Sequence, residues 1–297
     1  MNRWLVVSLA TALAAPTAHA KGDDPQAAIT KLLHAQIDAM APLAGDEGVP
    51  EGVYLDGAQL STVGNGDQGK VGPSQFADAV VGPCYPKQRT IKQLHISPSA
   101  DGASAAASFL VELQSKCDVS GELFPMGARV SEVVVKTKDG WRIAGGAWST
   151  DEDNARTNEA ARAGKLAALQ PVGDSSAGDA SVGAAFAALL ADGVDKDGAA
   201  RADLIVFGSG PGERTTSGAP FARAWKAAWV GHIATTGPVR TEVAPSGTTA
   251  WVTANVKLTK GKAGATYAIP FRLFVVFDRT KAGAWSLIHV HIAAPTI

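Results

Sequence analysis

The sequence predicts an α+β protein made of two tandem cone-shaped barrel domains, each with helices followed by a curved antiparallel sheet. The chain has 297 residues, which is enough for two domains of about 150 residues with separate cores. The same order of segments occurs twice, and Trp141 in the first copy corresponds to Trp285 in the second. In each copy helical periodicity comes first and strand-like segments follow, which is the α+β pattern.

The first copy begins with a helix. Asp24 and Pro25 make a good helix start, because an acid caps the first turn and proline fits within it. Apolar residues follow at helical spacing, namely Ile29, Leu32, Leu33, Ile37 and Met40. A short apolar segment at residues 53–55 and a second helix near residues 73–81 come next. Strands are predicted at residues 89–97, 103–114, 128–138 and 141–149.

The second copy repeats this order. Its first helix carries Val182, Phe186, Leu189 and Leu190, and a short apolar segment follows at residues 204–207. A helix over residues 217–231 carries three aromatic residues, Phe221, Trp225 and Trp229. Strands are predicted at residues 239–244, 248–259, 265–277 and 284–293. Residues 95–113 align with residues 241–258, and Phe76 aligns with Phe221.

These patterns divide the chain into a signal peptide at residues 1–20, a first domain at 21–150, a linker at 151–178 and a second domain at 179–297. The start carries Arg3, an apolar run and the small-residue sequence Ala-His-Ala at residues 18–20, which is typical of an export signal. We therefore expect a periplasmic or secreted protein. The linker is polar and rich in alanine, and a helix is predicted at residues 154–169.

Composition limits the possible partners. The chain is 46% hydrophobic and 19% charged with a net charge of −1, which is typical of a globular protein without a membrane span. No block of lysine and arginine occurs, so nucleic acid is not an expected partner. The two cysteines, Cys84 and Cys117, are predicted to form a disulfide in an oxidising compartment, with two free buried thiols as the alternative.

Two stretches of the second copy resemble a known family. The segment FGSGPGERTTSGAPFARAW at residues 207–225 is similar to the helix-to-pocket segment of SnoaL-like proteins. The closing segment WSLIHVHIAAP at residues 285–295 resembles the final strand of the wider nuclear transport factor 2-like superfamily, and also that of the association domain of calcium/calmodulin-dependent kinase II. The resemblance covers residues 180–297 and extends more weakly to residues 24–150.

The resemblance implies a cystatin-like cone with a small-molecule pocket or an assembly role, and frequent dimers. We therefore expect the two halves to pack as an intrachain pseudo-dimer, and a homodimer stays open. The superfamily also includes isomerases, cyclases and dehydratases, and the fold does not choose among them. The first copy departs from the pattern, because Gly145 and Ala147 stand where the second copy has His289 and His291.

The residues expected to reach a pocket in the second domain are Asp203, Glu213, Trp225, Trp229, Tyr267, Arg272, His289 and His291. The two tryptophans share one helix face and suit either a core or an aromatic pocket wall. The resemblance implies that an enzyme of this type would use a pocket acid or histidine as general base. Asp203 stands just before an apolar run, where such an acid could lie. Asp56 is its rough counterpart in the first copy.

His289 and His291 point to the same side of the last predicted strand. Zinc needs a third or fourth ligand, which the sequence does not place nearby. We therefore predict that the pair makes hydrogen bonds at a pocket or an interface and is neither a metal site nor a catalytic pair. The sequence predicts no metal, no cofactor and no assigned catalytic residue.

The sequence is compatible with three functions. The first and favoured one is an exported, non-catalytic protein that binds a small apolar ligand or a partner protein through the pocket of the second domain. The second is an enzyme with a pocket acid or histidine as general base. The third is a structural pseudo-dimer whose cones are filled with side chains.

Overall fold

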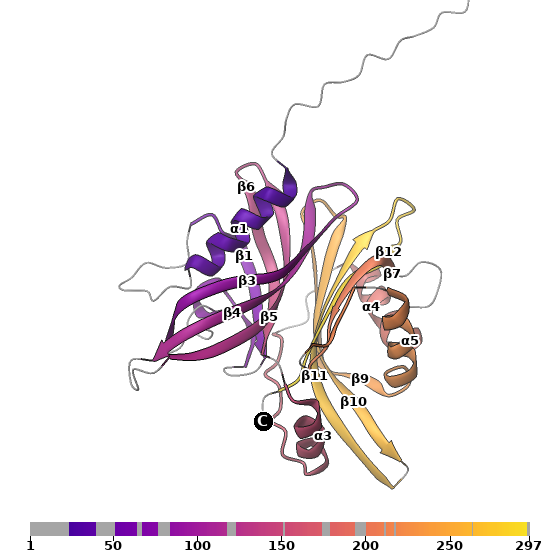
Figure 1. Cartoon of the computed structure of the whole chain (residues 1–297). Coiled ribbons are helices and arrows are strands. Elements are labelled where there is room, and N and C mark those ends of the chain that lie inside the picture. The colour runs from indigo at the N-terminus through magenta and orange to yellow at the C-terminus, as the bar shows by residue number, and fades with distance from the viewer. Residues whose placement is uncertain are drawn as a thin grey trace, which may run out of the picture.

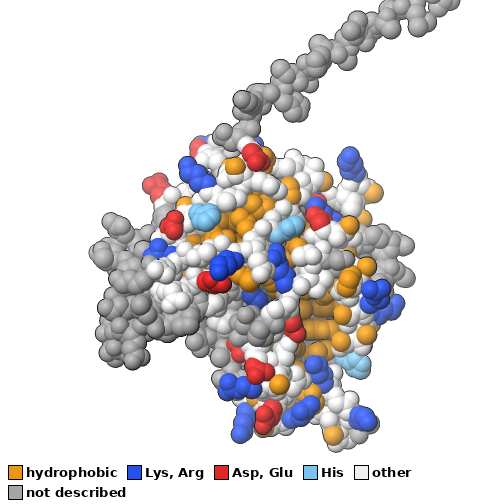
Figure 2. All heavy atoms as spheres, in the orientation of Figure 1, with side chains coloured by type: hydrophobic (Ala, Val, Ile, Leu, Met, Phe, Trp, Pro, Cys, Tyr) orange, Lys and Arg blue, Asp and Glu red, His pale blue; other side chains and the backbone are white. Residues whose placement is uncertain are grey.

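The structure is a computed structural model that describes residues 24–39, 51–63, 67–76, 84–117, 123–150, 152–173, 179–193, 200–210, 212–216, 218–262 and 264–295. The predicted signal peptide, Met40 and most of the second helix expected near residues 73–81 lie outside these ranges. Within the described ranges, no helix is long and apolar enough to cross a membrane. On the face that Figure 2 shows, positively and negatively charged side chains are interspersed.

The first domain contains one described long helix and a six-stranded sheet. Its elements are α1 (Pro25–Ala39), β1 (Tyr54–Val63), β2 (Gln68–Val71), β3 (Cys84–Pro98), β4 (Ser104–Cys117), β5 (Leu123–Thr137) and β6 (Gly140–Ser149). The strand order is β2-β1-β6-β5-β4-β3. The sheet curves around α1, which lies on the face of the sheet directed away from the second domain (Figure 1).

The second domain repeats this arrangement. Its elements are α4 (Ala180–Asp192), β7 (Ala200–Phe207), β8 (Arg214–Thr215), α5 (Gly218–Ala228), β9 (Ile233–Val243), β10 (Thr249–Lys262), β11 (Ala265–Arg279) and β12 (Trp285–Ala293). The strand order β8-β7-β12-β11-β10-β9 is that of the first sheet, strand for strand. The predicted pair of tandem α+β domains is therefore confirmed.

Each sheet is mixed rather than wholly antiparallel, which is a correction to the sequence prediction. β1 pairs parallel with β6, and β7 pairs parallel with β12. The sequence showed β7 only as the apolar segment 204–207, because the first half of this strand is polar and half-exposed. The first and last strands of each domain can pair in parallel, because a long connection separates them in the chain.

The helices cover the concave face of each sheet. Helix α1 buries Ile29, Leu33 and Ile37 at helical spacing against a core that includes Phe109 and Trp148. In the second domain, α4 and α5 contribute to a separate core around β10, β11 and β12. Full burial of each such large apolar side chain is worth about 1.5–3 kcal/mol, so these two cores fix the helices on their sheets.

The linker contains helix α3 (Asn154–Arg162), which is shorter than predicted. Asp153 caps its first turn by accepting hydrogen bonds from the backbone of Ala155 and Arg156. The sequence predicts a helix to residue 169, but Gly164 follows the last turn with a φ of 66°. A left-handed glycine in this position ends a helix.

After α3 the chain crosses between the domains as an extended strap at residues 165–173. The carbonyl of Gln170 accepts hydrogen bonds from Asn255 Nδ2 at 2.9 Å and Arg272 Nη2 at 2.5 Å. Arg272 is 1% exposed and also donates to Asp67 Oδ1 and the Thr62 carbonyl, both at 2.6 Å. This buried guanidinium therefore ties the strap and the first domain to the second sheet.

The two sheets pack against each other through their outer, convex faces (Figure 1). A third apolar core lies between them and contains Ala106, Val133, Val135, Ala144 and Ala147 from the first domain and Ala244, Trp251, Phe274, Val276 and Ile288 from the second. Ser104 and Thr249 occupy corresponding positions in the two copies, and their hydroxyl oxygens are 2.6 Å apart. The halves are therefore related by a local twofold axis that passes close to this pair.

The side chains at this interface differ in size between the two sheets. Neighbouring strands of the second sheet align Trp251, Val276 and His289 in one row. The corresponding row of the first sheet is Ala106, Val133 and Gly145. A Cβ atom on Gly145 would lie 2.7 Å from Trp251 Nε1, so only glycine leaves room for the indole.

His289 and His291 lie in this interface and are fully buried. Ser131 Oγ is 2.6 Å from His289 Nε2 and 2.8 Å from His291 Nδ1, and Ser149 Oγ is 2.7 Å from His291 Nε2. His289 also makes a hydrogen bond with the backbone of Ile205, which leaves Nε2 as an acceptor in the neutral ring. Ser149 Oγ then donates to His291 Nε2, and His291 Nδ1 donates to Ser131 Oγ. Ser131 Oγ in turn donates to His289 Nε2.

Burial lowers the pKa of His289 to about 3 and holds the pKa of His291 well below its usual value, and nearby positive charge adds to both effects. Below about pH 6.5 these imidazoles bind protons in the unfolded chain but not in the folded chain, so the free energy of unfolding falls as the pH falls. We expect wild type to lose about 2 kcal/mol of unfolding free energy relative to His289→Gln between about pH 6.5 and about pH 5. Denaturant unfolding at each pH measures this difference.

The exposed His34 provides the matched control. His34→Gln should follow the wild-type pH dependence throughout. A His289→Gln protein whose unfolding free energy parallels wild type over this range would show that His289 titrates normally in the folded chain.

The backbone register places Cys84 directly opposite Cys117 on β3 and β4, although their side chains lie outside those that the structure describes. Opposite residues in an antiparallel pair have Cα atoms about 4.5–5.5 Å apart, which is within disulfide range. The disulfide stays a prediction. Alkylation without reductant, followed by intact mass measurement on exported protein, should show no modified thiol, and the double Cys→Ser variant should lose about 3–4 kcal/mol of stability. Two alkylated cysteines would contradict the pairing.

Candidate functional site

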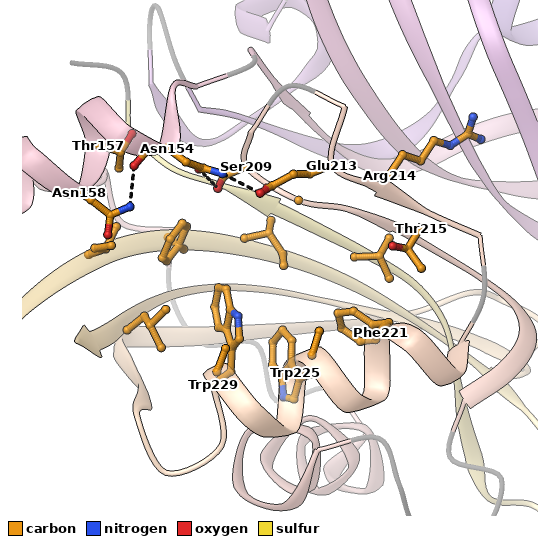
Figure 3. A pocket seen from close by; sticks show the side chains of 18 of the residues that line it. Asn154, Thr157, Asn158, Ser209, Glu213, Arg214, Thr215, Phe221, Trp225 and Trp229 are labelled. Atoms are coloured by element: carbon orange, nitrogen blue, oxygen red, sulfur yellow. Dashed lines mark hydrogen bonds between the residues drawn. The ribbon is translucent and has the colours of Figure 1, made fainter. Parts of the chain in front are cut away.

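A pocket of about 480 Å³ opens in the second domain between α5, α3 and the concave face of the sheet (Figure 3). One wall is aromatic and belongs to α5 and β11. The opposite wall is polar and belongs to α3 and the segment after β7. The linker helix therefore completes a pocket whose other walls belong to the second domain.

The aromatic wall consists of residues spaced one helical turn apart on α5. The rings of Trp225 and Trp229 are stacked, with centroids 4.8 Å apart and planes 9° apart. Phe221 continues the row one turn earlier, and Phe271 of β11 contacts Trp229 at 5.1 Å. Trp225 Nε1 donates to the Leu189 carbonyl at 3.0 Å, which fixes the first indole against α4. The result is a rigid apolar wall.

The polar wall is held by a small hydrogen-bond network. Asn154 Nδ2 donates to Glu213 Oε1 at 2.6 Å, and Ser209 Oγ donates to Asn154 Oδ1 at 3.0 Å. The backbone N–H of Gly210 donates to Glu213 Oε2 at 2.8 Å. A Cβ atom on Gly208 would lie 2.4 Å from Glu213 Oε2, so glycine at this position lets the carboxylate fold back over the turn.

The far end of the pocket is closed by Asn158. Its amide donates to the Asn154 carbonyl at 2.5 Å, and its Oδ1 accepts from the Tyr267 hydroxyl at 3.1 Å. The guanidinium of Arg162 lies over the Tyr267 ring at 5.1 Å. Tyr267 therefore supports the pocket from behind Asn158.

The structure separates the residues that the sequence groups together. Glu213, Trp225 and Trp229 line the pocket, and Tyr267 contacts it through Asn158. The other four candidates lie elsewhere. Asp203 forms a partly exposed ion pair with Arg201 at 2.7 Å, and the remaining three, Arg272, His289 and His291, lie between the domains.

The physical reason for this separation is strand alternation. His289 and His291 point away from the concave face, and the residues between and beside them, Val290 and Ile292, point into the second-domain core. Asn154 and Asn158 are not among the predicted pocket residues, because residues 151–178 have the composition of a linker. Their spacing of four residues, with Thr157 buried between them, indicates one shared helix face.

A second polar cluster, which the sequence analysis also missed, lies inside the first cone. Glu132 of β5 is fully buried and accepts hydrogen bonds from Gln36 Nε2 of α1 at 2.5 Å and Trp148 Nε1 at 3.3 Å. Gln36 Nε2 also donates to the Tyr54 hydroxyl at 3.0 Å. Among the described atoms, Glu132 Oε2 and Gln36 Oε1 have no hydrogen-bond partner.

Burial raises the pKa of Glu132 to about 7, and the hydrogen bonds from Gln36 and Trp148 only partly offset this effect. The corresponding position in the second domain is Val275, which pairs with Val290 as Glu132 pairs with Gly146. A lone acid between Val130 and Val134 on the inward face of an apolar strand was the signal in the sequence. Perturbed carboxyl groups of this kind occur at functional sites.

Within the described residues, no group of three or more His, Cys, Asp or Glu side chains is arranged to hold a metal ion. No curated protein matches the chain in sequence.

Several solved structures are similar to one domain. A nuclear transport factor 2-like superfamily protein from Salmonella enterica serovar Typhimurium is 20% identical over 44% of this chain and 92% of its own, with a TM-score of 0.36. A ketosteroid isomerase-like protein from Erwinia carotovora atroseptica is 17% identical over 44% and 100%, with a TM-score of 0.35. A protein with a cystatin-like fold from Caulobacter vibrioides is 15% identical over 46% of this chain and 96% of its own, with a TM-score of 0.33.

The match to a protein family is confined to the second half of the chain. It begins in α4 and includes the aromatic wall, the turn that carries Glu213 and the final strand. Residues 182–297 match the family described as the SnoaL-like domain, and the first domain repeats the strand order of this matched part.

Proposed function

We propose that the second domain binds a small, flat, apolar molecule in the pocket between α3 and α5. The observation that carries this proposal is the stacked pair of Trp225 and Trp229 facing the amides of Asn154 and Asn158 across about 480 Å³. Binding sites for small molecules combine an apolar lining with a few fixed polar groups in this way. A flat ligand would contact the indoles with one face and accept or donate hydrogen bonds at its edge.

Binding without turnover is the simplest function for this pocket. The carboxylate of Glu213 accepts one hydrogen bond on each oxygen, from Asn154 and Gly210, and these bonds stabilise its charged form and so disfavour its use as a base. Neither Asp203 nor the two histidines can reach the ligand, because they lie outside the pocket. The open volume also argues against a second cone that is filled with side chains.

We further propose that the protein acts after export. The support is the signal-like composition of residues 1–20 together with the register of Cys84 opposite Cys117. Both features suit an oxidising compartment outside the cytoplasm.

A second candidate function is proton transfer at Glu132 in the first domain. Its pKa of about 7 would let it exchange a proton near neutral pH, and among the described atoms its own Oε2 and the neighbouring Gln36 Oε1 lack hydrogen-bond partners. The enzyme alternative therefore rests on Glu132 and not on Asp203 or His289. Its test is deuterium uptake by a panel of small ketones in D₂O, followed by NMR: uptake that is lost in Glu132→Gln supports it, and no uptake with wild type contradicts it.

The ligand pocket can be tested with the neutral fluorophore N-phenyl-1-naphthylamine. Trp229→Ala removes one of the two stacked indoles, so binding should weaken by about tenfold, as expected for loss of about 1–2 kcal/mol of aromatic contact. Fluorescence titration of the full chain measures the dissociation constant. Trp285→Ala is the matched control, since it removes an indole of the same domain that does not line this pocket. Equal affinity in all three proteins would place the fluorophore elsewhere.

The environment of Glu132 can be tested through stability. Between about pH 4.5 and about pH 7 the folded chain keeps a proton that the unfolded chain has released, so stability falls as the pH rises. Glutamine cannot titrate, so Glu132→Gln should gain about 3 kcal/mol relative to wild type across this range. Glu112→Gln, an exposed change on β4, is the control. Denaturant unfolding curves measure both, and a Glu132→Gln protein that parallels wild type would mean that Glu132 ionises normally.

A further inference from the structure

A second pocket, of about 380 Å³, lies between the two domains on the other side of strand β8. Gln93, Leu110 and Arg129 line it from the first domain, and Phe207, Glu213 and Arg214 line it from the second. Figure 3 shows that Glu213 and Arg214, which are neighbours in sequence, extend in different directions. Glu213 points toward Asn154, and Arg214 points away from the tryptophans.

Arg214 is held in place by uncharged groups. Its Nη1 donates to Gln93 Oε1 at 2.8 Å, and its guanidinium lies over the Phe207 ring at 5.6 Å. No carboxylate in the described part of the chain forms an ion pair with it, and its buried Nε has no hydrogen-bond partner there. Desolvation lowers the pKa of this arginine, and no nearby acid offsets the effect. A half-buried cation of this kind lacks its counter-ion.

The partner that orients Arg214 is itself strained. Gln93 lies in an irregular stretch of β3 and has a φ of 51°, the only positive φ of a non-glycine residue among the described residues. A side chain in the left-handed region costs about 1 kcal/mol or more, and such positions gather at functional sites. The strained backbone aims the amide of Gln93 at the guanidinium.

A second arginine lines the pocket from the first domain. Arg129 is buried and donates from Nη2 to the Ser209 carbonyl at 3.1 Å. Arg214 also lowers the pKa of both His95 and His289, which shows that its positive charge reaches them. Glu213 is the one acid in the lining, and Asn154 and Gly210 hold its carboxylate away from Arg214.

We propose that this interdomain pocket binds a small organic carboxylate, with its oxygens on Arg214 and its carbon body against Leu110 and Phe207. The planar guanidinium matches a carboxylate in shape and charge, and the two apolar side chains give an organic anion more contact than an inorganic one. The proposal does not depend on the ligand of the aromatic pocket. Glu213 and Arg214 border both pockets, but Gln93, Leu110 and Phe207 line only this one.

Isothermal titration of the full chain with sodium benzoate tests the proposal, with benzamide as the uncharged analogue and inorganic phosphate as the compact anion. Ionic strength is kept constant with sodium chloride. We expect saturable binding of one benzoate, and binding of benzamide and phosphate that is weaker by about tenfold or more. Absence of saturable benzoate binding, or tighter binding of phosphate, would overturn the proposal.

Two variants locate the site. Arg214→Gln should weaken benzoate binding by about tenfold or more, whereas Arg223→Gln on the exposed face of α5 makes the same charge change and should bind as wild type does. Gln93→Gly removes the amide that orients Arg214 while relieving the left-handed backbone, so it should fold at least as stably and still bind benzoate several-fold more weakly. Should Arg214→Gln fail to fold, Gln93→Gly decides the question. Wild-type affinity in the folded variants would place benzoate outside this pocket.

Discussion

The packing of one sheet against the other is the constraint on which the rest of this molecule depends. Both convex faces are buried, and they carry hydroxyl and imidazole groups that would destabilise the fold if they were left unpaired. These groups are paired in one chain of hydrogen bonds between the two domains, which consists of Ser149, His291, Ser131 and His289. The chain of hydrogen bonds works only with neutral rings, so the same contact fixes the position of the domains and the charge of both histidines.

Both pockets follow from this fixed arrangement. The strap at residues 165–173 has one path between the sheets because Arg272 holds the Gln170 carbonyl, and α3 therefore rests over the mouth of the second cone. Arg129 of the first domain donates to the Ser209 carbonyl, just before the turn that carries Glu213 and Arg214. The aromatic pocket needs the linker helix, and the interdomain pocket needs both sheets.

Sequence patterns predicted the duplicated α+β fold, because hydrophobic periodicity and the order of elements are local properties. They also predicted the aromatic wall, since Trp225 and Trp229 share a helix face whatever surrounds them. They did not exclude Arg272, Asp203 and the histidines from the pocket, because the side of a strand that faces a pocket depends on what covers the other side. The histidines make the hydrogen bonds that were predicted for them, and they make them at the interface. Glu132 and Arg214 were not predicted for a related reason. A single charged residue in a strand or turn can be recognised as a candidate site only when its burial and its partners distant in sequence are known, and here these partners are Gln36 and Gln93.

The unequal row of side chains at the interface limits how the halves can associate. Trp251 occupies space that exists only because Gly145 stands opposite it, and the counterpart of Gly145 in the second sheet is His289. If two second domains packed in the same way, the indole of Trp251 would overlap the imidazole of His289. If two first domains did so, a void would remain between Ala106 and Gly145. Self-association of either half through this face is therefore blocked. In a symmetric homodimer, every substitution at the interface occurs in both subunits. In a chain that contains both domains, a substitution changes only one of the two sheets. The two sheets can therefore acquire different side chains that fit each other, such as a large one opposite a small one.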